Sequence, residues 1–396
     1  MVSPYPIITG IGVVAPNGIG KDAYWKNCAA GTSGIRPITR FDATTYGVFE
    51  GGEIVGFDPQ QYLGSKGLRN LDRTTLLALV AAKLALDDAK LTIDDREAST
   101  TGIVLGSTMG SIHSIANFDL EALREGPRYV NPAQFPNTVI NSPASQLAIR
   151  FGIRGLNATV GTGFAASYSA LEYAIDMIRL GRAKRILVGG AEELCPEMCA
   201  GFYGTGLLSR KPRSSNGNGH KRRCVGEGAG ILILEDPSTA AGRGAAGYGE
   251  VVGASSRFGR IGAHETSVDD LVGLLEVLRQ QERVTEEAID LVCGTDFLEM
   301  PLPSGSAQGG TRLSGMTPGR VALEPLVGQC FSAMGALEII GGIGVGRTWG
   351  ASLLAVGTSS PIGVQAVSLI RLGDSLEKAP KDLIAQTTSQ GNDNSG

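Results

Sequence analysis

The chain has 396 residues, 42% of them hydrophobic, and a formal net charge of −4 with acidic and basic residues interspersed. This length suffices for two large cores or a duplicated domain, and the charge gives no reason to expect nucleic acid or an anionic membrane as a partner. No apolar run is long enough to cross a bilayer and no signal segment precedes the first predicted strand, so we expect a cytoplasmic protein. The six cysteines are scattered, which is typical of reduced thiols. Only three histidines are present, none of them near the cysteine pair at 195 and 199, so no metal site is expected, and no cofactor either.

Short apolar runs alternate with amphipathic stretches, which favours an α/β protein with helices packed on buried sheets. The apolar runs predict strands at residues 7–14, 101–105, 158–161, 185–189, 229–234, 247–254, 291–293, 352–357 and 364–372. The amphipathic stretches predict helices at residues 74–89, 143–151, 167–180, 267–281 and 333–342.

Two loop-rich segments, 206–224 and 238–246, divide the sequence near its middle, and each part supplies its own strands and helices. We therefore predict a duplicated architecture with halves at 1–245 and 246–380. The segment 381–396 has no apolar periodicity, so it is predicted to be a disordered tail.

The stretch 159–167 (TVGTGFAAS) has the surroundings of a nucleophile turn: a β-branched apolar run, small residues, and then a predicted helix. A cysteine on such a turn has its pKa lowered by the helix N-terminus, and backbone N–H groups hold an oxyanion. The central position here is Phe164, whose ring can neither attack a thioester nor give a proton to a base. The sequence therefore predicts the setting of a catalytic site without its nucleophile.

Other motifs are weaker. The GIGVVA run at 10–15 fits a dinucleotide-binding pattern, but the turn at 16–18 replaces the expected helix, so a strand leaving through a glycine-rich turn is favoured. His220 and His264 lie outside every motif and are expected to have surface or local roles, and His113 is distinguished only by its neighbours.

Five segments occur in a specific order and spacing: ITGIGVVAPNGIG, GTSGIRPITRFD, FPNTVINSPASQLAIRFGIRGLNATVGTG, ILVGGAEEL and VGEGAGILILED. In these segments the chain resembles the β-ketoacyl synthase family of the thiolase fold along almost its whole length. The resemblance implies an α/β fold in which two duplicated, ketoacyl-synthase-like βαβαβ halves form a five-layer α-β-α-β-α sandwich.

The resemblance also implies a reaction site that has lost its chemistry. The family cysteine falls on Phe164, the first family histidine on Cys293, and the lysine and second histidine of a later K-x-x-x-G-H run on Glu324 and Gln329. The gating phenylalanine of a G-F-G-G-T-N loop falls on Pro361. Because Cys293 is a poor donor and Gln329 carries no charge, no catalytic residue is predicted. Cys293 and Cys330 are expected to be buried, inert thiols rather than substitute nucleophiles.

Loss of catalysis with retention of the fold resembles the chain length factor of type II polyketide synthases, which pairs with an active ketosynthase and shapes the tunnel for the growing chain. Phe164 departs from the glutamine usual at this position, which indicates an atypical branch. The partners implied are an active ketosynthase subunit, in a heterodimer, and an acyl carrier protein reached through the complex.

The segment 106–118 matches the family region that reaches into the partner's acyl pocket. Apolar residues recur every third position in it and put an apolar stripe on one face of a helix; an ordinary core stripe is the alternative. The segment 133–142 is expected to supply the rest of the interface. The predicted tunnel and interface residues are Met109, Ile112, Ile115, Phe118, Phe135 and Asn137.

Two alternatives belong to other functional classes. The first is a catalytically divergent enzyme of the same fold, an acyltransferase or a malonyl decarboxylase using other residues. The second is a stand-alone acyl-binding protein. Cys293 and Glu324 argue against decarboxylation, because an enolate needs donors and not added negative charge.

Overall fold

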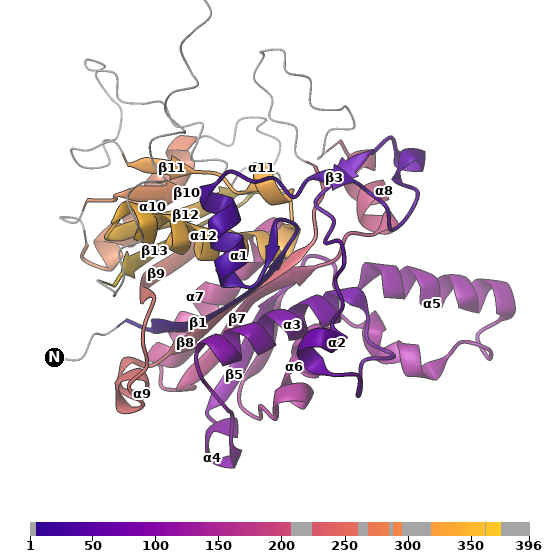
Figure 1. Cartoon of the computed structure of the whole chain (residues 1–396), viewed down its shortest axis with the longest axis horizontal. Helices are drawn as coiled ribbons and strands as arrows, with labels where there is room; N and C mark the ends of the chain where they lie inside the picture. Colours follow the sequence, from indigo (N-terminus) through magenta and orange to yellow (C-terminus); the bar gives the residue numbers. More distant parts are fainter. Residues whose placement is uncertain are drawn as a thin grey trace, which may run out of the picture.

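The computed structural model describes residues 5–206, 224–259, 268–284, 288–294, 318–360 and 362–373. Within them, eleven strands form one sheet in which β2 pairs only with β1 and the others run in the order β11-β10-β12-β13-β9-β1-β8-β7-β5-β6 (Figure 1). The strands are β1 (Ile7–Ala15), β2 (Gly18–Ile19), β5 (Thr101–Gly106), β6 (Asn157–Val160), β7 (Arg185–Glu192), β8 (Gly228–Glu235), β9 (Gly249–Phe258), β10 (Leu291–Cys293), β11 (Gly319–Val321), β12 (Leu353–Ser359) and β13 (Val364–Leu372). A separate pair is formed by β3 (Arg36–Pro37) and β4 (Glu50–Gly51).

The sheet contains the same arrangement twice. If the main strands of each half are numbered along the chain, both halves have the order third, second, fourth, fifth, first. In both, the fifth strand (β8 or β13) is antiparallel to its two neighbours and the remaining pairs are parallel. The halves join where Ile7 and Ile8 of β1 pair with Glu250 and Gly249 of β9. This topology confirms the predicted thiolase-like, duplicated α/β fold, whereas the boundary at residue 245 stays a prediction.

Helices cover both faces of each half-sheet. The longer ones are α1 (Lys21–Ala29), α3 (Arg73–Asp88), α5 (Ile112–Glu125), α6 (Ser142–Phe151), α7 (Ala166–Arg179), α8 (Pro196–Gly204), α10 (Val268–Gln281) and α12 (Met334–Trp349). The shorter ones are α2 (Gln60–Leu63), α4 (Asp95–Ala98), α9 (Pro237–Gly242), α11 (Glu324–Val327) and the 3-10 turns η1 (Ala43–Tyr46), η2 (Pro132–Thr138), η3 (Gly163–Ala165) and η5 (Phe331–Ala333).

Helices α7 and α12 form the central layer, because each contacts strands of both halves. Helices α3 and α6 cover the outer face of the first half-sheet, and α10 covers that of the second (Figure 1). Separate apolar cores on the two outer faces and a large one around α7 and α12 give the five layers predicted.

Helix α3 shows how the sequence builds one layer. The Asp72 side chain accepts a hydrogen bond from the Thr75 backbone N–H (2.8 Å) and caps the helix, which then buries an apolar face on the sheet. Gly10 and Gly12 of β1 are needed there, because a Cβ on either would lie within 2.5 Å of a carbonyl oxygen of α3. The two glycines therefore serve close helix–sheet packing within the predicted strand, which leaves through a turn at residues 16–17 as expected.

Other predicted boundaries also need correction. Helix α12 continues to Trp349 and does not end at residue 342 as predicted. Glycines disfavour a helix interior, but residues 334–346 are all buried, and this burial stabilises the helix. Strand β11 and helices α1 and α8 were not predicted. Met109 lies before α5 and not on it, so the predicted helical stripe begins at Ile112.

Candidate functional site

The nucleophile position lies on the turn that joins β6 to α7. Gly163 opens this turn with a φ of 66°, a conformation that glycine adopts without strain. Phe164 follows it and is 3% exposed. Its ring packs edge-on against Phe202 (centroids 5.4 Å apart) and Phe331 (5.3 Å), and these two rings lie 4.3 Å apart. We call these three residues the aromatic cluster.

The aromatic cluster is the centre of a small apolar core of its own. Residues from η1 and the turn after it, from the segment that leads from β7 into α8, from α8 and from the segment before β8 surround it: Ala43, Val48, Leu194, Cys195, Met198, Cys199, Tyr203 and Val225. Ile112, at the start of α5, packs against the outside of this core. The space in which a thioester would have to reach the turn is therefore occupied by side chains.

Ile362 covers the turn from the outside. Its Cδ1 lies 2.9 Å from the place where a Cβ on Gly163 would stand, and its side chain is 39% exposed. The resemblance places a glycine of the family's mobile loop at this position, so the change from glycine to isoleucine could have been noticed in the sequence. The neighbouring predicted gate position, Pro361, lies outside the described residues.

Gln329 and Glu324 lie together beside the cluster, and both are buried. The Gln329 side-chain Nε2 donates to Glu324 Oε2 (3.3 Å), and its Oε1 accepts from the Phe331 backbone N–H (2.9 Å). Phe331 has a φ of 47°, which for a residue with a side chain costs about 1–3 kcal/mol. Gln329 therefore supports a strained turn with one end of its amide and binds Glu324 with the other.

Cys293 lies at the end of β10 and is fully buried. Its Sγ donates to the Glu338 carbonyl oxygen (3.4 Å) of α12. Burial, and then the charge of Glu338, raises the pKa of this thiol well above its ordinary value; burial does the same for Cys330. Because the thiolate is the nucleophilic form, neither cysteine can substitute for the missing nucleophile.

A buried polar network, not predicted from the sequence, lies next to Phe331 in the chain. Glu192, at the end of β7, accepts hydrogen bonds from the Thr108 backbone N–H (3.0 Å) and the Ser332 hydroxyl (2.5 Å). Thr108 Oγ1 in turn accepts from the Ser332 backbone N–H (3.0 Å). Burial raises the pKa of Glu192 to about 6. The network joins the segment before α5 to the segment before α12; the only sequence signal was an acidic pair ending an apolar strand.

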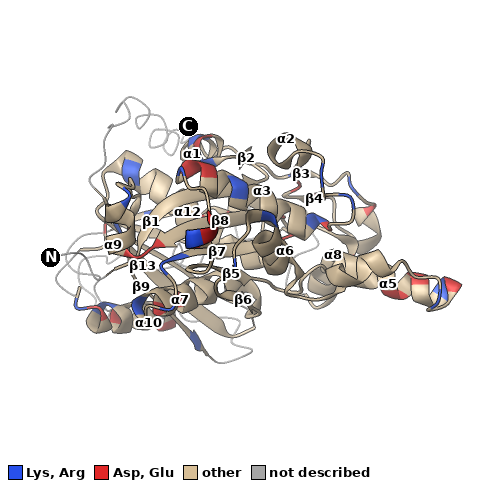
Figure 2. Cartoon of the chain, turned by 90° about the horizontal axis from the view of Figure 1, so that it is seen from below, with Lys and Arg blue, Asp and Glu red and all other residues tan. Residues whose placement is uncertain are grey.

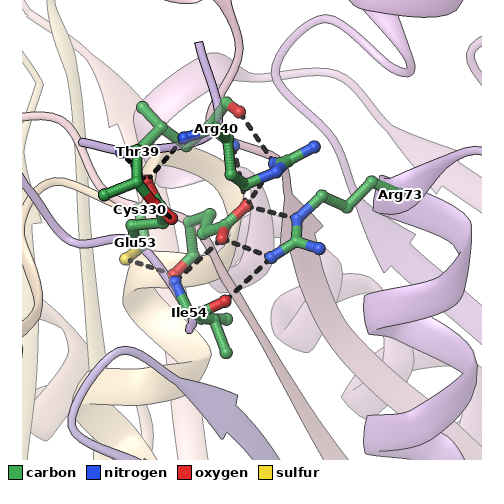
Figure 3. Close-up of polar contacts among 8 residues, drawn as sticks. Thr39, Arg40, Glu53, Ile54, Arg73 and Cys330 are labelled. Atoms are coloured by element: carbon green, nitrogen blue, oxygen red, sulfur yellow. Dashed lines mark hydrogen bonds and ion pairs between the residues drawn. The ribbon is translucent and has the colours of Figure 1, made fainter. Parts of the chain in front are cut away.

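A second buried network brings Arg40, Ile54 and Arg73 together (Figure 3). The fully buried Glu227 carboxylate accepts from Arg73 Nε (2.8 Å) and Nη2 (2.6 Å) and from Arg40 Nη1 (3.3 Å). It also accepts from the backbone N–H groups of Ile54 (2.9 Å) and Leu194 (3.2 Å). With every oxygen satisfied, this carboxylate is a structural anchor; removing one partner of such a buried pair costs about 3–5 kcal/mol.

The predicted tunnel and interface residues lie on a projecting part of the molecule. Helix α5 extends away from the rest of the protein (Figures 1 and 2), and none of its fourteen residues is buried. Phe118 packs edge-on against Phe135 of η2 (6.2 Å), and Ile115 is half-buried. The apolar residues that are more than 40% exposed here are Met109, Leu120, Leu123, Tyr129, Phe135, Val139 and Ile140. We call residues 109–140 the arm.

Asn137 differs from the other residues predicted for the interface. It is 2% exposed, and its side-chain Nδ2 donates to the Asn70 carbonyl oxygen (2.6 Å) and to Gln134 Oε1 (3.1 Å). It ties the arm to the main body instead of facing a partner. Of the predicted interface residues, Ile112 thus packs on the apolar core around the aromatic cluster, Phe118 contacts Phe135, and Asn137 is buried against the main body.

No helix among the described residues is long and apolar enough to cross a membrane. The same residues hold no group of three or more His, Cys, Asp or Glu side chains placed to bind a metal ion.

Residues 7–240 match the sequence model of "Beta-ketoacyl synthase, N-terminal domain". A 3-oxoacyl-[acyl-carrier-protein] synthase 2 of Vibrio cholerae is 34% identical over 254 residues, which are 62% of this chain and 61% of that protein. The Synechocystis protein of the same name is 35% identical with the same coverage. The match therefore spans less than two thirds of the length of these relatives.

Solved structures resemble nearly the whole chain. The structure described as "The ishigamide ketosynthase/chain length factor" superposes with a TM-score of 0.79 at 26% identity, covering 93% of this chain and 99% of that one. A beta-ketoacyl synthase from Burkholderia phymatum gives 0.78 at 21% identity, with coverages of 94% and 100%, which bears on the fold alone.

Proposed function

The chain belongs to the beta-ketoacyl synthase family, and we propose that within this family it is a non-catalytic chain length factor that pairs with an active ketosynthase. The observation that carries the proposal is the phenyl ring of Phe164 at the nucleophile position, buried among Phe202 and Phe331. A phenyl ring cannot form a thioester, and among the described residues its packing with Phe202 and Phe331 fills the space next to the turn.

The other positions of the family mechanism support the same conclusion. The resemblance implies two histidines that stabilise an enolate and a thioester oxygen, and one lost donor of this kind typically costs about 10²–10³ in rate. Here the Cys293 thiol is committed to a backbone carbonyl, and both ends of the Gln329 amide are engaged. Glu324 places a carboxyl group where the family has a lysine. The one further N–H of the Gln329 amide is a neutral donor, which cannot replace two histidines.

The exposed apolar arm supports a partner. A helix of fourteen residues with no buried side chain gains little from its own packing, since helices in proteins are stabilised mainly by burial of one face. A stable protein–protein interface buries roughly 800 Å² on each side, and the arm offers apolar surface for one. The similarity to a structure described as a ketosynthase/chain length factor favours an active ketosynthase as that partner.

The place of Ile112 supports a role in setting chain length. Ile112 packs on the apolar core around Phe164 and also begins the helix that would reach the partner. Met109, in the turn before it, is 45% exposed. In the heterodimer, these two side chains would form part of the wall of the elongation tunnel, and the carrier protein would be reached through the ketosynthase subunit.

Co-expression with an intact ketosynthase tests the proposal. The two chains should purify together, the pair should condense malonyl units, and this chain alone should neither condense nor decarboxylate a malonyl thioester. Ile112→Ala and Met109→Trp should change product length without loss of the complex. Decarboxylation by the chain alone would favour the divergent-enzyme alternative. A well-behaved single chain that binds acyl groups and ignores the ketosynthase would favour the acyl-binding alternative.

A further inference from the structure

We infer that His113 is a positioning residue: its hydrogen bond to Glu197 fixes the first turn of α5 against α8 and so sets where the tunnel wall stands. This inference rests on the proposed function, because it gives His113 a part in determining product length. His113 touches none of the positions that the family uses for catalysis in the contacts described above.

The geometry around His113 selects one arrangement of its ring. His113 Nδ1 lies 3.0 Å from Glu197 Oε2, and its Nε2 lies 3.0 Å from Asn117 Nδ2. A carboxylate can only accept and an amide nitrogen can only donate, so Nδ1 donates to Glu197 and Nε2 accepts from Asn117. One tautomer, with its proton on Nδ1, satisfies both contacts. The ring is therefore held at two points, one on α8 and one on α5.

Helix α5 depends on such contacts because it has few others with the main body. Ile112 packs on the apolar core around Phe164, while Phe118 packs on Phe135, which is itself 59% exposed. Helix α8 is the firm element of the pair, because its Met198, Cys199, Phe202 and Tyr203 are all buried. Glu197, in the first turn of α8, gives the arm a fixed point on the body.

The same contacts link α5 to the position of the missing nucleophile. The Phe164 ring packs on Phe202, which lies on α8, and Glu197 of α8 holds His113 of α5. Helix α8 thus contacts Phe164 through Phe202 and contacts the arm through Glu197. The ring at the nucleophile position therefore packs on the helix that positions α5.

The hydrogen bond is expected to matter for position and not for overall stability. The His113 and Glu197 side chains are 39% and 26% exposed, and exposed pairs of this kind contribute little to the free energy of unfolding. A small shift of α5, however, moves Ile112 and Met109 directly. Substitutions at the pair should therefore leave the fold intact while changing the space available to the growing chain.

A matched pair of variants separates the two ring contacts. In His113→Asn the side-chain amide nitrogen stands where Nδ1 stood, so the bond to Glu197 is kept; in His113→Gln it is lost. Glu197→Gln keeps an acceptor, Glu197→Ala removes it, and Asn117→Ala removes only the contact within α5. The variants are measured as full-length chains in complex with the ketosynthase, with the ratio of the two most abundant product lengths as the readout.

His113→Gln and Glu197→Ala should each change the product ratio about two- to tenfold, the range expected for loss of one hydrogen bond. His113→Asn, Glu197→Gln and Asn117→Ala should stay within about twofold of the original ratio. Unchanged ratios for both His113→Gln and Glu197→Ala, in complexes that assemble normally, would overturn the inference.

Amide hydrogen exchange over residues 112–125 of the uncomplexed full-length chain gives a second readout that needs no partner. Exchange should be faster in His113→Gln and Glu197→Ala than in His113→Asn. Equal exchange in all variants would contradict the attachment of α5 to α8. If the unsubstituted chain forms no complex with any ketosynthase, the proposed function fails, while the exchange measurement still decides whether His113 holds α5.

Discussion

The aromatic cluster and the arm lie next to each other, and they are packed in opposite ways. The rings of Phe164, Phe202 and Phe331 are at most 6% exposed, whereas Leu123 of α5 is 82% exposed. An active condensing enzyme needs an open path to the nucleophile turn, and in the described part of this chain aromatic rings are packed at that turn. The arm, by contrast, retains apolar surface with nothing in the described chain to cover it. The contrast supports the proposal that the chain acts through a surface that binds a partner.

The largest expected effect tests the packed side of this contrast. Phe164→Ala should lower the free energy of unfolding by about 3–5 kcal/mol, because it removes a buried aromatic ring and leaves a cavity between Phe202 and Phe331. Urea denaturation measures this loss, with Leu123→Ala as the exposed control, expected within about 0.5 kcal/mol of the original. A loss below about 1 kcal/mol for Phe164→Ala would show that the cluster is loosely packed.

The next effect tests the uncovered side. Replacing Leu120 and Leu123 together by lysine should weaken the complex with the ketosynthase at least about 30-fold, because charges would replace apolar contacts worth about 2 kcal/mol. The melting temperature of the single chain should not change. Leu180→Lys is the matched control, since Leu180 is 67% exposed at the end of α7, away from the arm. If the variant with both lysines bound the ketosynthase as tightly as the unsubstituted chain does, the arm would not be part of the interface.

Another expected effect depends on pH and concerns the buried acid Glu193. Burial, and then repulsion from Asp72, raises the pKa of Glu193 from its ordinary 4.5 to about 8. The folded chain therefore keeps a proton that the unfolded chain has released, and stability falls as pH rises between these values, by up to about 1.4 kcal/mol per pH unit.

Glu193→Gln should remove that fall, so the variant should gain stability relative to the original chain between pH 5 and pH 8. Denaturation curves at several pH values measure the difference. Parallel pH dependences for the two proteins would show that the Glu193 carboxyl is solvated in the folded state.

The last substitution, Phe164→Cys, is expected to have no effect on acyl transfer. Phe164→Cys restores the family nucleophile, but Cys293 and Gln329 still stand where the family has histidines, and Ile362 still covers the turn. No acyl group should be transferred to the substituted position from an acyl-carrier thioester, as judged by mass spectrometry of the intact protein. Acylation there would mean that the site is open and that the packed interior is not the barrier.

Much of the fold could be predicted from the sequence because strands and helices of this type carry strong periodic signals. Strands β10 and β13 were predicted at their observed bounds, and α3, α7 and α10 within one residue. The short strand β11 and helix α8 were missed, since three residues give no period and α8 is apolar on most sides. Helix α12 extends past its glycines because burial in the central layer outweighs their low propensity.

The candidate site was predictable only where the resemblance supplied positions. It located Phe164, Cys293, Glu324 and Gln329, but nothing in the spacing indicated that Phe202 and Phe331 would meet the ring of Phe164. Nor could it place Glu197 beside His113, since the two residues are 84 apart in the chain. Such contacts depend on how three helices and a turn pack, which single-sequence patterns do not encode.

The burial of the thiols has a practical consequence for work on the assembled pair. Five of the six cysteines are buried and Cys224 alone is partly accessible, and burial raises the pKa of Cys195 and brings that of Cys199 to about 12. In the proposed pair, a thiol-alkylating reagent should therefore react with this chain mainly at Cys224 and faster with an activated cysteine of a condensing partner. With Cys224→Ser in this chain, the label taken up by the pair should come almost entirely from the partner.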